Sequence, residues 1–359
     1  MKSNERLKRL RGLMKARGIN AFLITDPVNV EYVSGFTGGD SCAFILPKEQ
    51  YLLTDGRYTE MAEEEAVGFE VLTRKMRLTE LIEQVARKRR LKEIAFEGFG
   101  ISYDTLREYR KALGGVRWRA QRPMIHTLRR VKDAREVALI EECVKVAQDA
   151  MRAVRKQLRA GLTENEVAAE LDYQMRKRGG QKAAFNTIVA AGPHSSQPHA
   201  ATGKRKMRQG DAVTIDWGAR MNGYNCDLTR VFFIGKAQPK FRKIYNIVLR
   251  AQQMAIEIAR PGVAIQRMDA VAREYITAQG YGPQFSHSLG HGLGMEVHEA
   301  PAVNRTAKGN LEAGFVITVE PGIYVPGFGG VRVEDDVLIT EKGARVLSDF
   351  PREIEQLIV

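Results

Sequence analysis

Acidic residues stand inside strand-like segments in the C-terminal half of this chain, where apolar residues are normally found. The segment AVTIDWGARMNGYNCDLTRVFF contains two such runs, with Asp216 in the first and Asp227 in the second, on either side of Asn222 and Gly223. Asn-Gly is the strongest short-range signal for a β-hairpin, so we expect the two runs to pair antiparallel. A loop of two or four residues centred there places both carboxylates on one face, diagonal or directly opposite, roughly 5 to 8 Å apart. Carboxylates buried that close repel each other unless a positive charge lies between them.

A second pair of acidic residues follows the same pattern further along the chain. Glu320 stands at the end of the apolar run FVITV and Glu334 follows GVRV, and Gly327 is equidistant from both. A hairpin centred on that glycine would bring these two carboxylates together as well.

The segment HSLGHGLGMEVHE lies between the two acidic pairs and carries His287, His291 and His298, half of the six histidines. Each of its three glycines costs about 1 kcal/mol in a helix interior, which disfavours a helix with two histidines on one face. In an extended chain His287 and His291 share a face, whereas His298 faces the other way unless a glycine bulge intervenes. We expect a bent strand around a polar pocket; for this segment alone, a loop with surface histidines is the alternative.

Four strand carboxylates and one histidine form a candidate set of metal ligands: Asp216, Asp227, His291, Glu320 and Glu334. Oxygen ligands with one imidazole suit a pair of divalent ions such as Mn2+ better than a thiolate-type zinc site, with Co2+ or Zn2+ as alternatives. A capped or salt-bridged strand end would explain any single acid, and we assign Asp211, Asp335 and Asp336 to that class. Four such positions together need more positive charge than Arg230 and Arg332 supply, because each uncompensated buried ion costs several kcal/mol.

The sequence pattern predicts two domains with different arrangements of helices and strands. The first third alternates helical patterns with short apolar strands such as AFLIT, AFILP and YLLTD, which is typical of an α/β domain. A long amphipathic helix is expected from Asp133 to Gly161, and a second helix begins behind Thr163 as its cap. Short strands then dominate, which indicates an α+β domain with a curved, largely antiparallel sheet. We expect an N-terminal α/β domain at residues 1–127 and a catalytic domain at 128–359.

Charge and composition exclude several classes of partner. The formal net charge of +13 raises the possibility of nucleic-acid binding, but the cations are scattered and no aromatic platform accompanies the groups RKRR and KRKMR. No run reaches the roughly 18 apolar residues of a membrane span, and the N-terminal sequence is charged throughout. We therefore expect a cytoplasmic protein without nucleic-acid or membrane partners. The three cysteines lack a paired spacing and are expected to be reduced and structural.

At these residues the sequence resembles the pita-bread metallopeptidases, a family that includes methionine aminopeptidase, aminopeptidase P and prolidase, with creatinase as a metal-free relative. The motifs TIDWGA, CDLTR, HSLGHGLGMEVHE, TVEPGIY and GVRVEDD occur in the family's order, and the resemblance spans essentially the whole chain. It implies a pita-bread catalytic domain in which the five candidate residues bind two ions, Asp227 serving one and bridging to the other. Creatinase lacks this ligand set, so its presence favours a hydrolase.

The resemblance also implies a substrate class. Methionine aminopeptidases generally lack a separate N-terminal α/β domain, whereas aminopeptidase P and prolidase carry one, which favours cleavage of Xaa-Pro peptides. Some dipeptidases have an arginine just after the HE-x-P segment, where this chain has Ala302. We therefore expect an aminopeptidase P-like enzyme that releases the N-terminal residue, with a Xaa-Pro dipeptidase (prolidase) as the alternative. A catalytically inactive scaffold is the alternative from a different class, and the resemblance implies a homodimer.

The expected mechanism follows from these assignments. Two ions about 3.5 to 4 Å apart can share a water, lower its pKa and present it as a bridging hydroxide to the scissile carbonyl. Glu320 is expected to take the water's proton and pass it to the proline nitrogen, which must be protonated to leave. The resemblance adds His199 and His298, which would hydrogen-bond the developing oxyanion or the substrate carbonyl.

Three further side chains complete the expected site. His287 would shape the proline pocket, and Arg332 would orient a carboxylate ligand. Tyr324 is a candidate for the same supporting role or for a proton relay. We assign His126 and His194 to structural roles.

Overall fold

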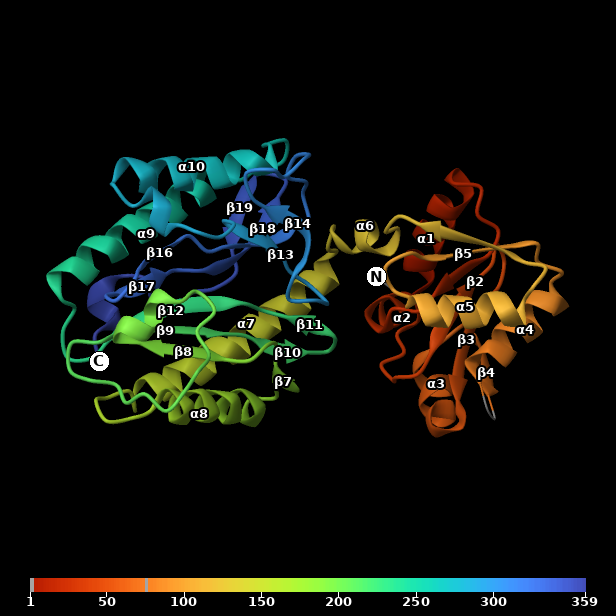
Figure 1. Cartoon of the computed structure of the whole chain (residues 1–359), viewed down its shortest axis with the longest axis horizontal. Helices are drawn as coiled ribbons and strands as arrows, with labels where there is room; N and C mark the ends of the chain where they lie inside the picture. Colours follow the sequence, from red (N-terminus) through yellow and green to blue (C-terminus); the bar gives the residue numbers. More distant parts are fainter. Residues whose placement is uncertain (1–2, 75–76) are drawn as a thin grey trace. The chain divides into compact units, whose positions relative to one another are not determined.

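The computed structural model describes residues 3–74 and 77–359, which divide into two compact units between Arg129 and Arg130 (Figure 1). Each unit has its own sheet system and is described separately. None of the helices among the described residues is long and apolar enough to cross a lipid bilayer.

The N-terminal unit is built on one mixed six-stranded sheet in the order β4-β3-β2-β1-β5-β6. The antiparallel pairs are β1 with β2 and β2 with β3, and the other neighbours are parallel. The strands are β1 (Phe22–Ile24), β2 (Cys42–Ile45), β3 (Gln50–Asp55), β4 (Glu70–Arg74), β5 (Glu93–Glu97) and β6 (Arg117–Gln121). The helices are α1 (Ser3–Ala16), α2 (Pro27–Ser34), α3 (Thr59–Glu65), α4 (Leu78–Lys88), α5 (Tyr103–Ala112) and α6 (Ile125–Arg129). The core joins α4 and α5 to the sheet through apolar residues such as Leu53, Val85 and Phe96. The α/β prediction for this part of the chain is confirmed.

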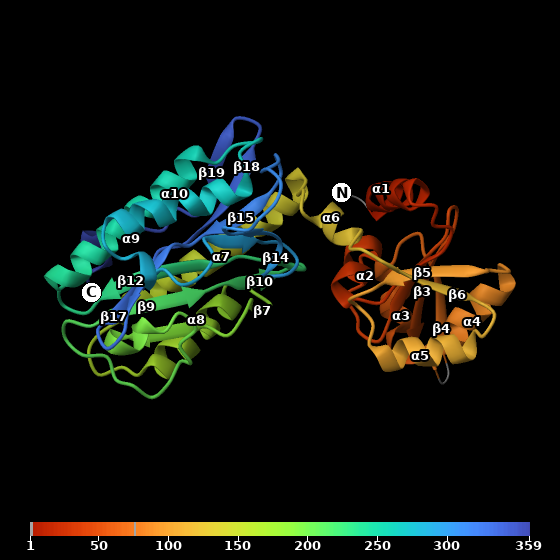
Figure 2. The same ribbon diagram turned by 45° about the horizontal axis from the view of Figure 1, so that its top comes forward.

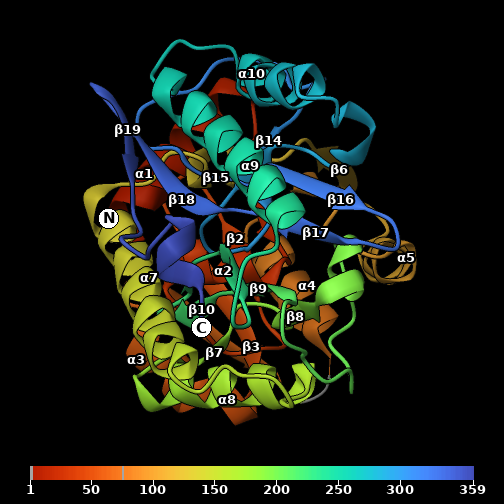
Figure 3. The ribbon, with the colours of Figure 1, turned by 90° about the vertical axis from the view of Figure 1, so that its left-hand side faces the viewer.

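In the C-terminal unit, strands lie between two pairs of helices. The helices are α7 (Ala134–Arg155), α8 (Glu164–Lys177), α9 (Pro239–Ile258) and α10 (Ile265–Ala278). Figures 2 and 3 show α9 and α10 together on one side of the strands, with α7 and α8 on the other. The predicted cap of α8 is confirmed, because the Thr163 side chain and Glu166 form a reciprocal capping box.

The helix predicted from Asp133 to Gly161 is shorter than expected and ends at Arg155. Its start is as predicted, with Asp133 as the N-cap. Beyond the end the chain turns so that Leu158 is buried, and Gly161 at φ +94° donates its backbone N–H to the Met207 carbonyl. Tertiary contacts thus override a helical pattern that continued in the sequence.

The strands of this unit pair antiparallel throughout. They form the sheets β12-β9-β8, β14-β13-β15-β18-β19, β11-β10-β7 and β16-β17. Their bounds are β7 (Lys182–Ala183), β8 (Ile188–Ala191), β9 (Ala212–Trp217), β10 (Ala219–Met221), β11 (Tyr224–Asn225), β12 (Leu228–Phe233), β13 (Gly290–Gly292), β14 (Glu299–Val303), β15 (Val316–Val319), β16 (Gly322–Val325), β17 (Gly329–Arg332), β18 (Asp335–Thr340) and β19 (Gly343–Val346). A bridge between Thr229 and Glu334 joins two of these sheets. The predicted α+β domain with antiparallel sheets is confirmed.

Candidate metal centre

Both predicted hairpins are present and determine where the acidic side chains point. Asn222 and Gly223 form a two-residue turn with positive φ angles of 48° and 81°, and the pairing continues until Asp216 lies opposite Thr229. Asp227 precedes Thr229 by two residues, so it lies diagonal to Asp216 on the same face. The β16–β17 hairpin is centred on Gly327, and its register carries Glu320 and Glu334 to opposite positions.

The histidine segment is a bent strand, as predicted. Only Gly290–Gly292 forms strand β13, and its register with β14 shifts between His291 and Gly292. A Cβ atom on Gly290 would stand 2.1 Å from the Thr318 carbonyl oxygen, so only glycine permits this approach to β15. The bend carries the chain from His291 around to His298, and their ring centroids lie 4.2 Å apart.

These elements surround one cavity of about 850 Å³ in the C-terminal unit. The side chains that the sequence predicted as ligands or as catalytic groups line it: Asp216, Asp227, His199, His287, His291, His298, Glu320, Arg332 and Glu334. Tyr324, the candidate for a supporting role, is not among the lining residues and contacts Arg332 and His287 instead. The cavity wall also includes residues that sequence reasoning did not single out, among them Phe185, Ile188 and Val297. His194 is not among the lining residues; its Nδ1 lies 2.8 Å from Oε1 of the buried Glu164, in agreement with a structural role.

The acidic side chains and His291 converge closely. Asp227, His291 and Glu334 each offer one ligand atom, and these three atoms lie within 4.8 Å of one another. The Nε2 atom of His291 is 3.8 Å from Asp227 Oδ2 and 3.4 Å from Glu320 Oε1. Such spacing matches donor atoms arranged around a cation rather than hydrogen-bonded to each other.

Burial and mutual repulsion destabilise the charged forms of these carboxyl groups. Burial, followed by the charges of Glu334 and Asp216, raises the pKa of Asp227 well above its usual range. Burial and the charge of Glu320 act on the pKa of Glu334 in the same direction. Burial raises the pKa of Glu320 to about 8, although the positive charge of Arg332 opposes this shift. Among the described residues that line the cavity, Arg332 is the only lysine or arginine.

The donor atoms fit a divalent cation. Oδ1 of Asp216 and Oδ1 of Asp227 are buried, and neither has a hydrogen-bond partner in the described part of the chain. His291 Nδ1 lies 3.1 Å from the Gly292 carbonyl oxygen, which can only accept, so Nδ1 carries the proton and the Nε2 lone pair is available. Burial lowers the pKa of His291 to about 4, which keeps the imidazole neutral, as a metal ligand must be.

A hydrogen-bonded chain fixes Arg332 at the cavity wall. Arg332 donates to Asp216 Oδ2 at 2.5 Å, to the Tyr324 hydroxyl at 2.8 Å and to the Thr229 hydroxyl at 3.1 Å. Thr229 in turn donates to Glu334 Oε2 at 2.6 Å. Arg332 therefore contacts one predicted ligand directly and a second through Thr229.

Both ring nitrogens of His287 are occupied by protein groups. Nδ1 lies 2.7 Å from the Ser288 carbonyl oxygen and Nε2 lies 3.0 Å from the Tyr324 hydroxyl. Because Arg332 can only donate to Tyr324, the phenol proton is available for His287 Nε2. Burial lowers the pKa of His287 to about 4. His287 thus presents the face and edge of a neutral ring to the cavity.

Two threonines support the site and could have been found in the sequence. Thr229 lies two residues after Asp227 and Thr318 lies two residues before Glu320, so each shares a strand face with a predicted ligand. Thr318 donates its hydroxyl to Glu320 Oε1 at 3.2 Å and accepts the backbone N–H of His291 at 3.1 Å.

Each acid that the sequence analysis assigned to a structural role has an ion pair or a backbone hydrogen bond within the protein. Asp211 pairs with Arg205 at 2.8 Å and accepts the backbone N–H of Arg208. Asp336 accepts the backbone N–H of Asp227 at 3.0 Å. Asp335 is bound by two arginines and is considered further below.

Comparison with known proteins identifies the family and the fold of the chain. Residues 138–341 match the family described as metallopeptidase family M24, and residues 6–131 match the creatinase/prolidase N-terminal domain. The chain is 37% identical over 360 residues to the Xaa-Pro dipeptidase of Pyrococcus furiosus, covering 98% of this chain and 99% of that one. Its structure resembles the Xaa-Pro dipeptidase from Bacillus anthracis, with a TM-score of 0.96, 34% identity and complete coverage of both chains. It also resembles the X-Pro aminopeptidase from Thermotoga maritima, with a TM-score of 0.90 and 38% identity over 95% of this chain and 98% of that one.

Proposed function

The chain belongs to metallopeptidase family M24, and on that premise we propose that it is a Xaa-Pro dipeptidase that depends on two divalent metal ions. The observation that carries the proposal is the excess of buried carboxylates over cations around His291. The substrate class rests on the similarity, over nearly the whole length of both chains, to proteins named Xaa-Pro dipeptidase.

The two ions would be held by five side chains of the cavity: Asp216, Asp227, His291, Glu320 and Glu334. Mn2+ is the proposed metal and Co2+ or Zn2+ are the alternatives, since the donors are carboxylate oxygens with one imidazole. When bound, such a pair of ions lowers the pKa of a water molecule that it holds and polarises the scissile carbonyl.

Glu320 is the proposed proton carrier. Thr318 donates to its Oε1 atom, while its Oε2 atom lies 4.0 Å from Arg332 Nε, too far for a hydrogen bond. Oε2 is therefore able to take a proton from the attacking water. The carboxyl group then gives this proton to the proline nitrogen, which has no hydrogen in the peptide and leaves only when protonated.

His199 and His298 are proposed to bind the substrate carbonyl and the charge that develops on its oxygen. Both line the cavity, and within the described residues neither ring has a hydrogen-bond partner, in contrast to His287. Donors that are aligned in advance stabilise a developing oxyanion without reorganisation. The ring of His287 is proposed to form part of the wall around proline.

An aminopeptidase P-like activity is the second candidate, and the charge of the cavity wall favours it. A dipeptidase needs a cation for the free carboxylate of its substrate. Arg332, the only lysine or arginine among the described lining residues, is already bound to Asp216, Tyr324 and Thr229. The wall has Ala302 after Pro301, with no cationic side chain at that position.

The substrate assignment is tested by Mn2+-dependent hydrolysis of a Xaa-Pro dipeptide and a Xaa-Pro-Yaa tripeptide, with Xaa-Ala peptides as controls. Cleavage of the dipeptide and not of the tripeptide is the expected result. Cleavage of the tripeptide would establish the aminopeptidase instead. Cleavage of neither by the metal-loaded protein would contradict both proposals and leave the inactive scaffold.

Three further properties are proposed from the sequence. The two domains are assigned to residues 1–127 and 128–359, the protein is assigned to the cytoplasm, and it is expected to be a homodimer. Light scattering coupled to size exclusion should give twice the mass of one chain.

A further inference from the structure

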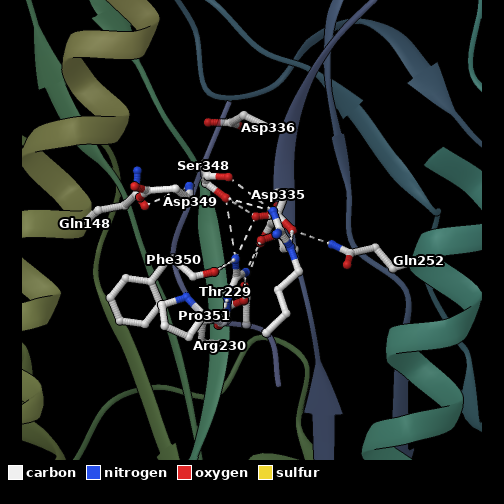
Figure 4. Close-up of polar contacts among 12 residues, drawn as sticks. Gln148, Thr229, Arg230, Gln252, Asp335, Asp336, Ser348, Asp349, Phe350 and Pro351 are labelled. Atoms are coloured by element: carbon white, nitrogen blue, oxygen red, sulfur yellow. Dashed lines mark hydrogen bonds and ion pairs between the residues drawn. The ribbon is translucent and has the colours of Figure 1, made fainter. Parts of the chain in front are cut away.

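A largely buried polar cluster lies on the strand faces opposite to the cavity. Figure 4 shows its hydrogen bonds and ion pairs. We call this cluster the back-face bracket; its members are Arg230, Gln252, Asp335, Ser348 and Arg352. Arg230 follows Thr229, and Asp335 follows Glu334, so alternation along the strands points them away from the face that carries Thr229 and Glu334. Neither Arg230 nor Asp335 lines the cavity, and both are fully buried.

Arg230 ties two strands together through their backbones. Its guanidinium donates to the carbonyl oxygens of Thr229 at 2.9 Å and Glu334 at 2.6 Å. It also donates to the carbonyl oxygens of Pro351 at 3.0 Å and Phe350 at 3.2 Å. The cation therefore holds the main chain at one proposed ligand and at the threonine that hydrogen-bonds the same ligand.

Asp335 is the centre of the bracket. Its Oδ1 atom accepts from Arg230 at 2.7 Å and from the Ser348 hydroxyl. Its Oδ2 atom accepts from Arg352 Nε at 2.7 Å and from the Gln252 amide at 2.9 Å. Both carboxylate oxygens are thus fully used by the bracket.

Gln252 extends the bracket to a third strand. It reaches from α9 toward Asp335 (Figure 4), and the same amide nitrogen donates to the Val319 carbonyl oxygen at 3.1 Å. Val319 immediately precedes Glu320. One network therefore hydrogen-bonds the main chain at three points near the proposed ligands. These points are Val319 at the end of β15, Glu334 just before β18, and Thr229 on β12.

We propose that the back-face bracket positions the carboxylates of Glu320 and Glu334 for metal binding, by fixing the backbone from which both side chains project. This inference rests on the proposed function, because it takes both glutamates to be ligands. Groups that support metal ligands from behind typically change metal affinity by about 10- to 100-fold when they are altered. The residues of the bracket are positioning residues, because none of them faces the cavity.

The bracket predicts that a change at Gln252 weakens metal binding although this side chain is remote from the cavity. Gln252→Met keeps the length of the side chain and removes both hydrogen bonds of its amide nitrogen. Asn29→Leu is a matched control. Asn29 is also a buried amide on a helix, but it belongs to the N-terminal unit, where its Nδ2 donates to Glu97 Oε1 at 2.6 Å. Ser348→Ala is a second test variant, which removes one donor to Asp335 with a smaller change.

The experiment is calorimetric titration of Mn2+ into the full-length apoproteins, at a temperature where each variant is folded by circular dichroism. We expect the Mn2+ Kd to rise by about 10-fold or more in Gln252→Met, to rise in the same direction in Ser348→Ala, and to stay within about twofold in Asn29→Leu. Thermal melts of the apoproteins separate this effect from stability, because a merely structural role would lower the apoprotein Tm without changing Kd.

The outcomes distinguish the inference from the function on which it rests. Wild-type Kd in both Gln252→Met and Ser348→Ala would overturn the bracket and leave the metallopeptidase proposal intact. An equal rise in Kd in Asn29→Leu would also overturn it, since the effect would then be a general one. If the wild-type protein binds no Mn2+, Co2+ or Zn2+, the proposed function fails and the inference fails with it.

Discussion

Glu334 and Asp335 are neighbours in the chain, yet their carboxyl groups have opposite surroundings on the two faces of one sheet. On the cavity face, Glu334 lies among Asp216, Asp227 and Glu320, and Arg332 is the one guanidinium among the described lining residues. Burial, followed by the charges of Glu320 and Asp216, raises the pKa of Glu334. On the back face, Asp335 is equally buried, but the charges of Arg230 and Arg352 outweigh burial and lower its pKa.

The carboxylates of the cavity face need a cation from outside the chain, whereas Asp335 on the back face does not. A buried charge that is paired within the protein is complete, whereas several buried charges without enough cations are stable as anions only when a cation is supplied. The cavity face has that deficit and the back face does not.

The largest effect is expected on the cavity face, from Asp227→Asn. This change keeps the shape of the side chain and removes a charge from the centre of the cluster. Turnover of a Xaa-Pro peptide should fall on the order of 10³-fold or more, since the ions supply several kcal/mol of transition-state stabilisation. Elemental analysis should show loss of bound metal while circular dichroism stays native. Wild-type turnover would remove Asp227 from the proposed ligands.

On the back face the corresponding change should affect stability first. Asp335→Asn leaves Arg230 without its buried counterion, and breaking such a pair typically lowers the free energy of unfolding by about 3 to 5 kcal/mol. Urea denaturation of the apoprotein measures this loss. The control is Asp149→Asn, in the exposed pairs with Lys145 and Arg152, which should change the same quantity by at most about 1 kcal/mol. A similar loss in both variants would mean that Asp335 is no better paired than a surface residue.

His298→Ala should separate turnover from metal binding on the cavity face. The ring lines the cavity but is not among the proposed ligands, so metal content should not change. Loss of one donor to a developing oxyanion typically lowers kcat by about 10²- to 10³-fold. A parallel loss of metal and kcat would argue that His298 is a ligand, and an unchanged kcat would exclude it from the site.

The apoprotein should also show a pH dependence that bound metal removes. The pKa of Glu320 is raised from 4.5 to about 8, so the folded state holds a proton that the unfolded state has lost in this range. The free energy of unfolding should therefore fall as pH rises from 4.5 to about 8, with a slope of at most about 1.4 kcal/mol per pH unit for each such proton.

The back face gives the opposite sign. The lowered pKa of Asp335 contributes stability above its ordinary value of 3.8, and this contribution is lost as pH falls through the folded-state pKa. Urea titrations between pH 3 and 9, with and without saturating Mn2+, measure both effects. Identical profiles for the apo and metal-loaded proteins would contradict the carboxylate excess on the cavity face.

The sequence predicted the cavity face well because local rules govern it. The Asn222–Gly223 turn and the symmetry about Gly327 fixed both hairpins, and a period of two along each strand fixed which acids share a face. The same period places Thr229 on the strand face of Asp227 and Thr318 on that of Glu320, although neither threonine was among the predicted site residues.

The back face could not be predicted in this way because its partners are far apart in the sequence. Arg230 meets Asp335 across 105 residues, and Gln252 reaches β15 from a helix whose sequence gives no sign of a polar contact. The chain from His287 through Tyr324 to Arg332 is likewise visible only in the folded protein. The helix α7 ends at Arg155, and beyond it Leu158 is buried and Gly161 hydrogen-bonds Met207, tertiary contacts that the helical pattern of the sequence does not reveal.

The number of metal ions that each chain binds decides whether the carboxylates of the cavity face form a dinuclear metal site. Apoprotein is dialysed against Mn2+, freed of unbound metal and analysed for its metal content. We predict two ions per wild-type chain and fewer than one in Asp227→Asn. A wild-type chain that retains a single ion would contradict the dinuclear site, and one that retains no Mn2+, Co2+ or Zn2+ would contradict the proposal that the carboxylates of the cavity face are there to bind metal.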